Sequence, residues 1–386
     1  MKKLTLVLTA WMCAVAGVNG AAAPIDFEGP GSAKPLVKKK DDDIRKALAE
    51  AASMRVENVA LIAAGGSHTV VLRKDGMALA WGENASGQLT GTLGKDSGSP
   101  LPVPAGPYDK LAAGGSSIVG VKRDGTLWVW GQQIAGSDAT GKRYAPKNVP
   151  IGGQIADVAA GGQHVLVLMA DGALWAWGGN QFGQVGDGTT IPRSTPMQIG
   201  SGFAKIAAGA SHSLAINRDG VLFAWGNNEL GQVGIAKLDD VTTPVEVGRE
   251  FVAISAGRNH SLGIKRNGTL MAWGDNQSGQ LGNASASPQT LPTKVAEGND
   301  WIAIAAGGNH SLGLRAKDGL FAWGANDEGQ LGVGTTANVA KPSRVEGAFV
   351  AIAAGGYHSV ARKENGSVWV WGAQPGGKLV NSPKSM

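Results

Sequence analysis

Six histidines are the residues of this chain whose type and spacing could do chemistry. They are all the histidines of the 386-residue sequence, and each stands at the same position of a repeated motif: His68, His164, His212, His260, His310 and His358. Imidazoles could hold a metal or relay a proton, but a metal site needs two or three of them within ligand distance, together with carboxylates. Equivalent positions in a ring of repeats would be too far apart. We therefore expect each histidine to make buried hydrogen bonds within its own repeat.

Other signatures of catalysis are missing from the sequence. It contains no Gly-x-Ser-x-Gly elbow, no His-Glu-x-x-His helix and no phosphate loop. The Asp-x-Gly string at Asp187 is too short for a calcium loop. We therefore expect no catalytic residue, no metal and no cofactor.

The histidine motif belongs to a unit that occurs seven times at steps of 47 to 50 residues. Its first glycines are Gly65, Gly114, Gly161, Gly209, Gly257, Gly307 and Gly355. A Trp-Gly pair follows each of them, with the tryptophans at 81, 130, 177, 225, 273, 323 and 371. A unit of this length cannot bury its apolar face alone, so it must stack on its neighbours. The tryptophans are expected to fill the space between units.

Each unit reads as a small antiparallel sheet. Short apolar runs such as Ser261 to Lys265 and Thr269 to Trp273 flank an Asn-Gly or Asp-Gly pair, which is a strong signal for a hairpin. One strand precedes this hairpin, and another follows near Pro244 to Val247. Four strands in each of seven units predict an all-β fold, a seven-bladed β-propeller of four-stranded blades.

The ends of the chain suggest how the ring closes. The seventh unit shows no clear fourth strand after Trp371, whereas residues 53–57 match the fourth-strand sequence that starts at Ser343. We therefore expect an N-terminal strand near 53–57 to pair with the last unit and so remove two sheet edges.

The repeat also carries a family resemblance. The string Ala-Ala-Gly-x-x-His-Ser-Leu, then Asp-Gly, then Ala-Trp-Gly-x-Asn-x-x-Gly-Gln-Leu-Gly resembles the repeat of the regulator of chromosome condensation family, whose members are seven-bladed propellers. It is nearly unbroken at His260 to Gly282 and at His310 to Gly332. Two units depart from it: the second has Ser117 in place of histidine, and the seventh reads Gly376-Gly377-Lys378-Leu379. The resemblance implies a fold more than an activity.

The N-terminus predicts export. Lys2 and Lys3 precede an apolar stretch from Leu4 to Val18 and then small residues, so residues 1–22 are predicted to be a signal peptide. Residues 23–52 are expected to form a linker and a short helix, and residues 53–386 the propeller. The one cysteine, Cys13, lies in the signal, so the mature chain has no disulfide. We identify the chain as a bacterial exported member of the family, periplasmic or secreted, without a membrane anchor after cleavage.

Charge gathers at the tips of the central hairpins. The chain carries +5, or +3 once Lys2 and Lys3 are removed, and this small balance gives no reason to expect nucleic acid as a partner. All tips should emerge on one face of the ring, where their cations would form a basic rim able to steer an acidic partner. The rim residues are Arg73, Lys74, Lys122, Arg123, Arg218, Lys265, Arg266, Arg315, Lys317, Arg362 and Lys363. Solvated turns that keep hairpins soluble are the alternative.

A second candidate surface is the opposite face, which should carry the long connections after each Trp-Gly. The tips of these connections vary between units, and variable loops on a rigid scaffold are where specificity usually resides. Their acidic candidates are Asp187, Asp239 and Asp240.

Three functions remain open at this point. The first is a monomeric scaffold that binds a protein partner through one face, as in the secreted propeller inhibitors of β-lactamase, which the chain also resembles in its repeat pattern. The second is a small-ligand-binding, glycan-binding or enzymatic propeller that uses the central cavity. The third is nucleotide exchange on a small GTPase, which the signal peptide disfavours. Units of 47 to 50 residues also leave no room for the inserted wedge of that exchange factor.

Overall fold

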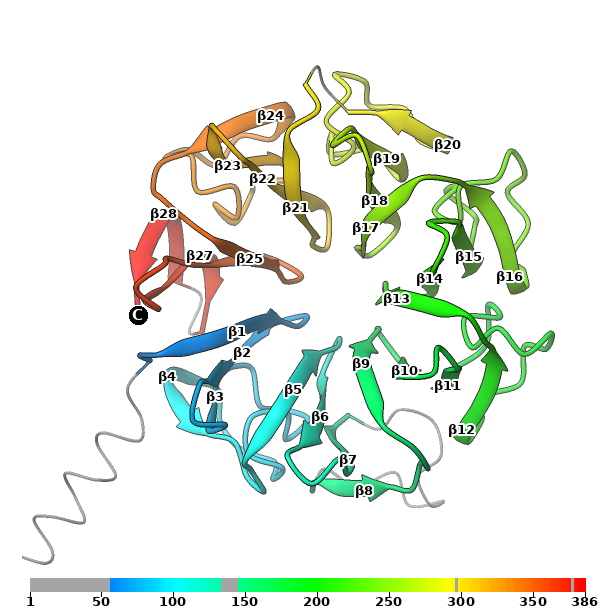
Figure 1. Ribbon diagram of the computed structural model, residues 1–386. Helices are drawn as coiled ribbons and strands as arrows, with labels where there is room; N and C mark the ends of the chain where they lie inside the picture. The colour runs from blue at the N-terminus through cyan, green and yellow to red at the C-terminus, as the bar shows by residue number, and fades with distance from the viewer. Residues whose placement is uncertain (1–55, 133–144, 296–297, 376–377) are drawn as a thin grey trace, which may run out of the picture. The chain divides into compact units, whose positions relative to one another are not determined.

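The computed structural model describes residues 56–132, 145–295, 298–375 and 378–386. These residues form 28 strands arranged as seven four-stranded antiparallel sheets. The sheets surround a central axis as the blades of a propeller, with the first strand of each blade innermost (Figure 1). The predicted fold class is confirmed. No helix in the described part of the chain is long and apolar enough to cross a membrane.

Each blade uses its strands in chain order from the axis outward. The innermost strands are β1 (Val59–Ala64), β5 (Tyr108–Ala113), β9 (Ile155–Ala160), β13 (Phe203–Ala208), β17 (Phe251–Ala256), β21 (Trp301–Ala306) and β25 (Ala351–Ala354). The second strands are β2 (His68–Arg73), β6 (Ser117–Lys122), β10 (His164–Met169), β14 (His212–Asn217), β18 (His260–Lys265), β22 (His310–Arg315) and β26 (His358–Arg362).

The outer half of each blade follows the same order. The third strands are β3 (Ala78–Gly82), β7 (Leu127–Gly131), β11 (Leu174–Gly178), β15 (Leu222–Gly226), β19 (Leu270–Gly274), β23 (Gly319–Gly324) and β27 (Val368–Gln374). The outermost strands are β4 (Ser97–Pro102), β8 (Lys147–Val149), β12 (Arg193–Gly200), β16 (Val241–Gly248), β20 (Gln289–Lys294), β24 (Val339–Val345) and β28 (Lys378–Ser385).

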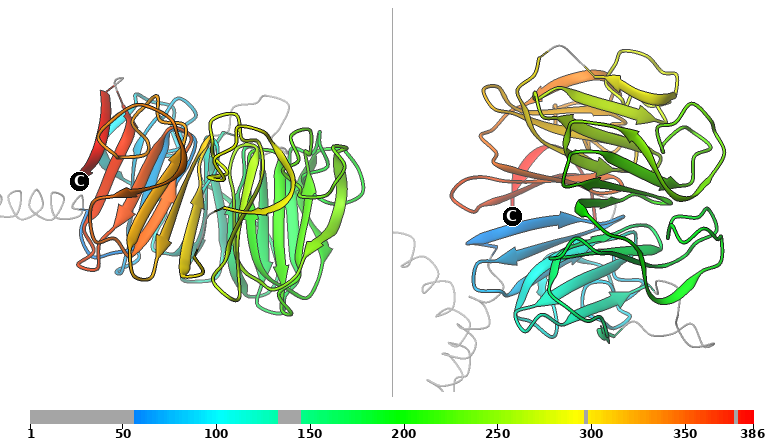
Figure 2. Two further views of the ribbon diagram at one scale, coloured as in Figure 1. Left: turned by 90° about the horizontal axis from the view of Figure 1, so that it is seen from above. Right: turned by 45° about the vertical axis from the view of Figure 1, so that its right-hand side comes forward.

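The antiparallel order gives the ring two faces that carry different connections between the strands (Figure 2). The Asp-Gly and Asn-Gly turns join the second and third strands. The glycine of each of the seven turns has a positive φ, between 81° and 93°. These turns all lie on one face, which we call the tip face. The Gly-x-x-His loops and the long connections after each Trp-Gly lie on the other, which we call the loop face.

The motif tryptophans form the core between blades, as expected. All seven are at most 3% exposed. Trp225 of the fourth blade packs against Leu166 and Leu168 of the third, and Trp273 of the fifth packs against Leu214 and Ile216 of the fourth. Burying a tryptophan removes roughly 200 Å² from water, which is about 5 kcal/mol of hydrophobic stabilisation at each interface.

The predicted closure by an N-terminal strand is wrong. The last blade has its own fourth strand, β28, which pairs with β27 between Gln374–Lys378 and Trp369–Ser385. Residues 56 and 57 are not in a strand, and residues 53–55 lie outside the described residues. The prediction failed because Leu379-Val380-Asn381-Ser382-Pro383 lacks the regular alternation expected of a strand, although a proline is tolerated at an outer edge.

The ring closes instead through the motif loops at the axis. In each blade the residue after the first motif glycine donates its backbone N–H to a motif carbonyl of the next blade. The acceptor is the carbonyl of the first motif glycine, and the N···O distances are 2.9 to 3.2 Å, for example 3.1 Å from Ala210 to Gly257. The last blade makes the same bond to the first, because Gly356 donates to the carbonyl of Gly65 at 3.1 Å. Seven bonds of one kind therefore close the ring without a shared strand.

This belt explains the first glycine of the motif. A Cβ atom at Gly307 would lie 2.6 Å from the carbonyl oxygen of Gly355 in the next blade, and it would also overlap the ring of His310 in its own loop. The other first glycines are equally confined by the next blade's carbonyl. The predicted signal peptide (1–22) and the predicted linker and helix (23–52) lie outside the described residues.

Candidate functional site

Five of the six histidines join neighbouring blades, and all six are buried. Each is at most 5% exposed. Nε2 of the histidine lies 2.9 Å from the hydroxyl oxygen of a serine or threonine in the next blade, in the pairs His164–Ser213, His212–Ser261, His260–Ser311, His310–Ser359 and His358–Thr69. The expected burial is therefore correct, but the bonds run between blades rather than within each blade. The missed signal was the Ser or Thr that directly follows the histidine.

The tautomer of these histidines follows from the hydroxyl group. Ser213, Ser261, Ser311 and Ser359 each donate their single hydroxyl proton to the backbone carbonyl of a glutamine in the preceding blade, at 2.7 to 2.8 Å. The serine oxygen can then only accept, so the histidine Nε2 carries the proton. Burial lowers the pKa of all six histidines, to about 3 for His68, His212, His260 and His310 and to about 4 for His164 and His358. They are neutral structural groups near pH 7.

The histidine belt is interrupted at the second blade. Ile118 stands where a hydroxyl would meet His68, and neither ring nitrogen of His68 has a hydrogen-bond partner. The second blade has Ser117 at the histidine position, and its hydroxyl is also unpaired. The third blade offers Val165 at the hydroxyl position. The junctions on both sides of the second blade therefore lack this bond, while the junction that closes the ring keeps it.

The long connections of the loop face are held by two buried amide side chains. The asparagine of each Trp-Gly-x-Asn string accepts a backbone N–H five residues later at 2.9 to 3.0 Å, at Asn84, Asn180, Asn228, Asn276 and Asn326. Its Nδ2 donates to carbonyls further along the loop, such as Ile191 at 3.1 Å. The glutamine of Gly-Gln accepts a backbone N–H two residues earlier. The loops are thus fixed at their base and differ at their tips.

Aliphatic side chains stand exposed at three of these tips. Leu93, Ile191 and Leu238 are 56%, 61% and 53% exposed, and they lie on the connections of the first, third and fourth blades. Each stands at or beside a carbonyl held by the buried asparagine: Asn84 donates to Thr92, Asn180 to Ile191, and Asn228 to Lys237 and Asp239. The loop base therefore presents an apolar side chain to solvent in a defined position.

The acidic loop candidates serve mainly to build these loops. Asp187 has a side chain only 1% exposed and pairs with Arg193. Burial opposes its ionisation, but hydrogen bonds from Thr189, Arg193 and Asn180 outweigh it and hold the pKa below its usual range. Asp240 accepts from the backbone N–H of Asn228 at 2.9 Å, whereas Asp239 is exposed. None of the three lines the central cavity.

The predicted rim cations lie at or beside the turns of the tip face, and many are engaged in contacts within the propeller. Arg73 pairs with Asp75 at 2.7 Å, and Arg315 with Asp300 and Asp318 at 2.7 and 2.9 Å. Arg123 lies 3.6 Å from Asp109, and Arg218 donates to the carbonyl of Asp171 in the preceding blade at 2.7 Å. The Arg218 contact joins two blades, and the others lie within one blade.

Lysines of the rim lie over aromatic rings. The ammonium of Lys122 is 3.8 Å from the ring centre of Trp128, that of Lys363 is 3.8 Å from Trp369, and that of Lys265 is 5.5 Å from Phe251. Such contacts contribute roughly 0.5 to 1 kcal/mol each at exposed sites. Lys74, Arg266 and Lys317 remain exposed, while Arg362 is partly buried.

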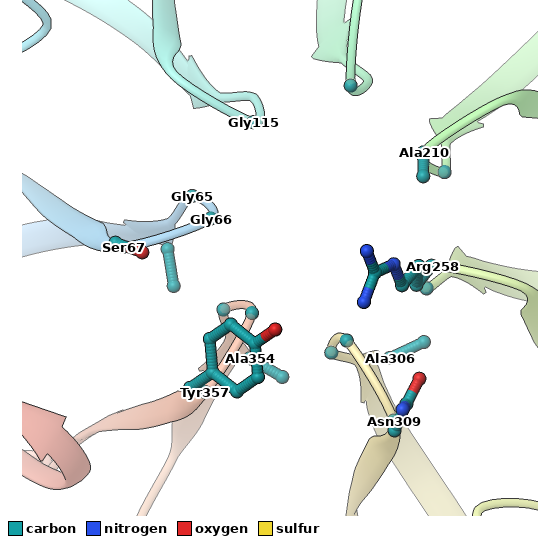
Figure 3. A pocket seen from close by; sticks show the side chains of 18 of the residues that line it. Gly65, Gly66, Ser67, Gly115, Ala210, Arg258, Ala306, Asn309, Ala354 and Tyr357 are labelled. Atoms are coloured by element: carbon teal, nitrogen blue, oxygen red, sulfur yellow. The ribbon is translucent and has the colours of Figure 1, made fainter.

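A central cavity of about 500 Å³ opens on the loop face. The seven motif loops surround it, and their glycines and alanines leave most of its wall without side chains (Figure 3). Among the described residues, no three His, Cys, Asp or Glu side chains lie close enough together to hold a metal ion. The polar side chains that line the cavity come mainly from one half of the ring, from the fifth blade round to the first, and include Arg258, Asn309, Tyr357, Ser67 and the carboxylates of Glu83, Asp327 and Glu328.

Comparison with solved structures shows the same fold. Prp20p from Saccharomyces cerevisiae, described with its binding to Gsp1p and histones, matches with a TM-score of 0.70 and 24% identity over 78% of this chain and 82% of that one. Human WBSCR16 matches with a TM-score of 0.71 and 24% identity over 80% and 88%. Yeast RCC1 (Prp20) bound to Kap60 matches with a TM-score of 0.71 and 21% identity over 95% and 91%. No curated protein sequence matches the chain.

Family models identify the repeat itself. The model described as the regulator of chromosome condensation (RCC1) repeat matches residues 171–216, 219–264, 267–314 and 317–362. A second model of the same repeat matches residues 59–88, 155–184, 203–232, 251–280 and 301–330. These segments contain the belt glycines and the histidines of six of the seven blades, and the loop asparagines of five. The chain therefore belongs to the regulator of chromosome condensation (RCC1) repeat family.

Proposed function

We propose that the protein is an exported scaffold that binds a protein partner through the loop face. The observation that carries this proposal is the exposure of Leu93, Ile191 and Leu238 on loops whose bases are rigid. Exposed apolar side chains favour association because contact with a partner removes them from water. A loop already held in its bound shape loses little entropy on binding.

The tip face offers less to a partner. Its cations Arg73, Arg123 and Arg315 are paired with carboxylates, and Lys122 and Lys363 lie over tryptophan rings. Docking there would have to compete with the contacts that these cations already make within their blades. Related propellers support protein binding in general, since the yeast structures are described with Gsp1p, histones and Kap60.

The test compares two triple variants with the wild type. One changes Leu93, Ile191 and Leu238 to Ser; the other changes Lys74, Arg266 and Lys317 to Glu. Both sets are exposed, so the melting temperature should stay within 2 to 3 °C of wild type. Proteins captured from the exported fraction by the wild type are identified, purified and titrated against all three.

We expect the loop-face variant to lose the partner and the tip-face variant to retain it. Loss with the tip-face variant alone would move the docking surface to the basic rim. A wild-type chain that captures no exported protein would contradict the scaffold function.

Export is proposed from the N-terminal sequence. Lys2, Lys3 and the apolar stretch from Leu4 to Val18 support a cleaved signal in a bacterial cell. N-terminal sequencing of the protein recovered from periplasm and medium should give a chain that starts between Ala21 and Ala23. A chain that stays in the cytoplasm and retains Met1 would refute export.

A further inference from the structure

The central cavity breaks the sevenfold pattern at one position. The residue after the first motif glycine is Gly66, Gly115, Gly162, Ala210, Gly308 or Gly356 in six blades, and Arg258 in the fifth. All seven line the cavity. The guanidinium of Arg258 extends into the open space at the axis, whereas the six other positions leave that space free (Figure 3).

The ring does not need this arginine. The backbone N–H of Arg258 makes the same belt bond as the other six residues, at 3.1 Å to the carbonyl of Gly307. Its side chain is exposed and forms no ion pair with any residue in the described ranges. The fold is complete without the side chain, so a cation in the cavity is available for another purpose.

Hydrogen-bond donors stand beside it. Tyr357 of the seventh blade directs its phenol hydroxyl into the same open space, and Asn309 of the sixth blade lines the cavity between the fifth and seventh blades. Tyr357 is 50% exposed, so its hydroxyl can meet a ligand. The opposite wall, from the second to the fourth blade, consists of glycine, alanine and Ser116, which leaves room for a ligand against the backbone.

The charged side chains that line the cavity favour an anion with one negative charge over an anion with two. Glu83, Asp327 and Glu328 line its mouth from the long connections. One guanidinium among three carboxylates suits a ligand with a single negative charge better than a phosphate with nearly two, because each added charge is repelled by the mouth. A planar carboxylate also matches the two parallel N–H groups of a guanidinium.

We propose that the central cavity binds a small monocarboxylic acid, whose carboxylate pairs with Arg258 and accepts hydrogen bonds from Tyr357 and Asn309. The volume of about 500 Å³ lies within the usual range of small-molecule sites. This site is independent of the loop tips that we propose as the protein-docking surface.

The test uses N-acetylglycine as the probe. Binding to the full mature chain is measured by the shift of the Arg258 Nε–Hε NMR signal and by calorimetry. Arg258→Gln is compared with Arg266→Gln, which loses the same charge on the tip face. Arg258→Gly is a second variant that should fold, because glycine occupies this position in five other blades.

We expect saturable binding that both Arg258 variants weaken by at least about tenfold, the typical value of a charge-assisted hydrogen bond. Arg266→Gln should bind as the wild type does. The proposal fails if N-acetylglycine does not bind, if the Arg258 variants bind it as the wild type does, or if inorganic phosphate binds as tightly.

Discussion

The hydrogen-bond belts around the axis and the tips of the long connections lie on the same face, but they differ in how much of their sequence repeats. The belts use one glycine, one histidine and one hydroxyl at the same place in most blades, all buried. The tips carry Leu93, Ile191 and Leu238 at unlike positions, all more than half exposed. The residues that repeat therefore stabilise the ring, whereas these exposed tips and Arg258 do not repeat and are the residues that we propose for recognition.

The largest effect should come from acid. The six histidines have pKa values of about 3 to 4 when folded and near 6.5 when unfolded. Below pH 6.5 the unfolded chain binds more protons, so stability is full above that pH and falls as the pH decreases toward 4. Each histidine contributes about 2 kcal/mol to this loss at pH 5.

The urea midpoint measured between pH 7.5 and 4.5 checks this behaviour. It should fall steeply below pH 6.5, and His260→Gln should reduce the number of protons taken up on unfolding by about one. A midpoint that stays flat down to pH 5 would mean that the histidines are not buried as neutral groups.

Overpacking the backbone belt should have the next largest effect. Gly307→Ala places a methyl group 2.6 Å from the carbonyl of Gly355 and against the His310 ring, so we expect a loss of about 3 kcal/mol. Gly98→Ala is the matched control, since nothing lies within 4 Å of its added Cβ. Chemical denaturation measures both. Equal denaturation midpoints for the two variants would show that neighbouring motif loops can move apart without loss of stability.

Deleting one hydroxyl of the histidine belt should cost less. Ser359→Ala removes the partner of His310 Nε2 and the donor to Gln330, at 2.9 and 2.7 Å, so a loss of about 2 kcal/mol is expected. Ser117→Ala removes a buried hydroxyl with no partner and should be neutral or slightly stabilising. If urea denaturation gives the same loss of unfolding free energy for both variants, the hydrogen bond between His310 and Ser359 contributes nothing to stability.

Substituting the loop tips should have the smallest effect on stability. Leu238→Ser changes an exposed side chain, and Asn228 still holds the carbonyls on both sides of it. We expect a change within about 0.5 kcal/mol. Asn228→Ala, which removes the loop's anchor, is the contrast and should cost more. A large loss from Leu238→Ser in thermal melting would place this side chain in the core rather than on a binding surface.

The repeat made most of the fold predictable. The spacing of the glycines and tryptophans gave seven units, and the Asp-Gly pairs placed the hairpin turns on one face. Closure was mispredicted because β28 is an outer strand, whose sequence meets few packing demands: its residues are exposed or only partly buried. The contacts that do close the ring are backbone hydrogen bonds between the motif loops. Such bonds involve no side chain, so the sequence carries no direct sign of them.

The candidate site was harder to predict for a related reason. Whether the histidines bonded within or between blades depends on the hydroxyl of the next unit, about 50 residues away, as in His310–Ser359. The engagement of Arg73 and Arg315 by carboxylates also depends on geometry rather than on composition. Arg258 was visible in the sequence as the one long side chain at a small-residue position, but only the structure places it at the axis.

Hydrogen exchange measured by mass spectrometry, with and without a captured partner, tests most directly which face recognises it. A partner bound on the loop face should give new protection in the long connections 83–96, 179–192 and 227–240, with no change in the turns between the second and third strands. New protection confined to those turns, around Lys74, Arg266 and Lys317, would contradict binding on the loop face.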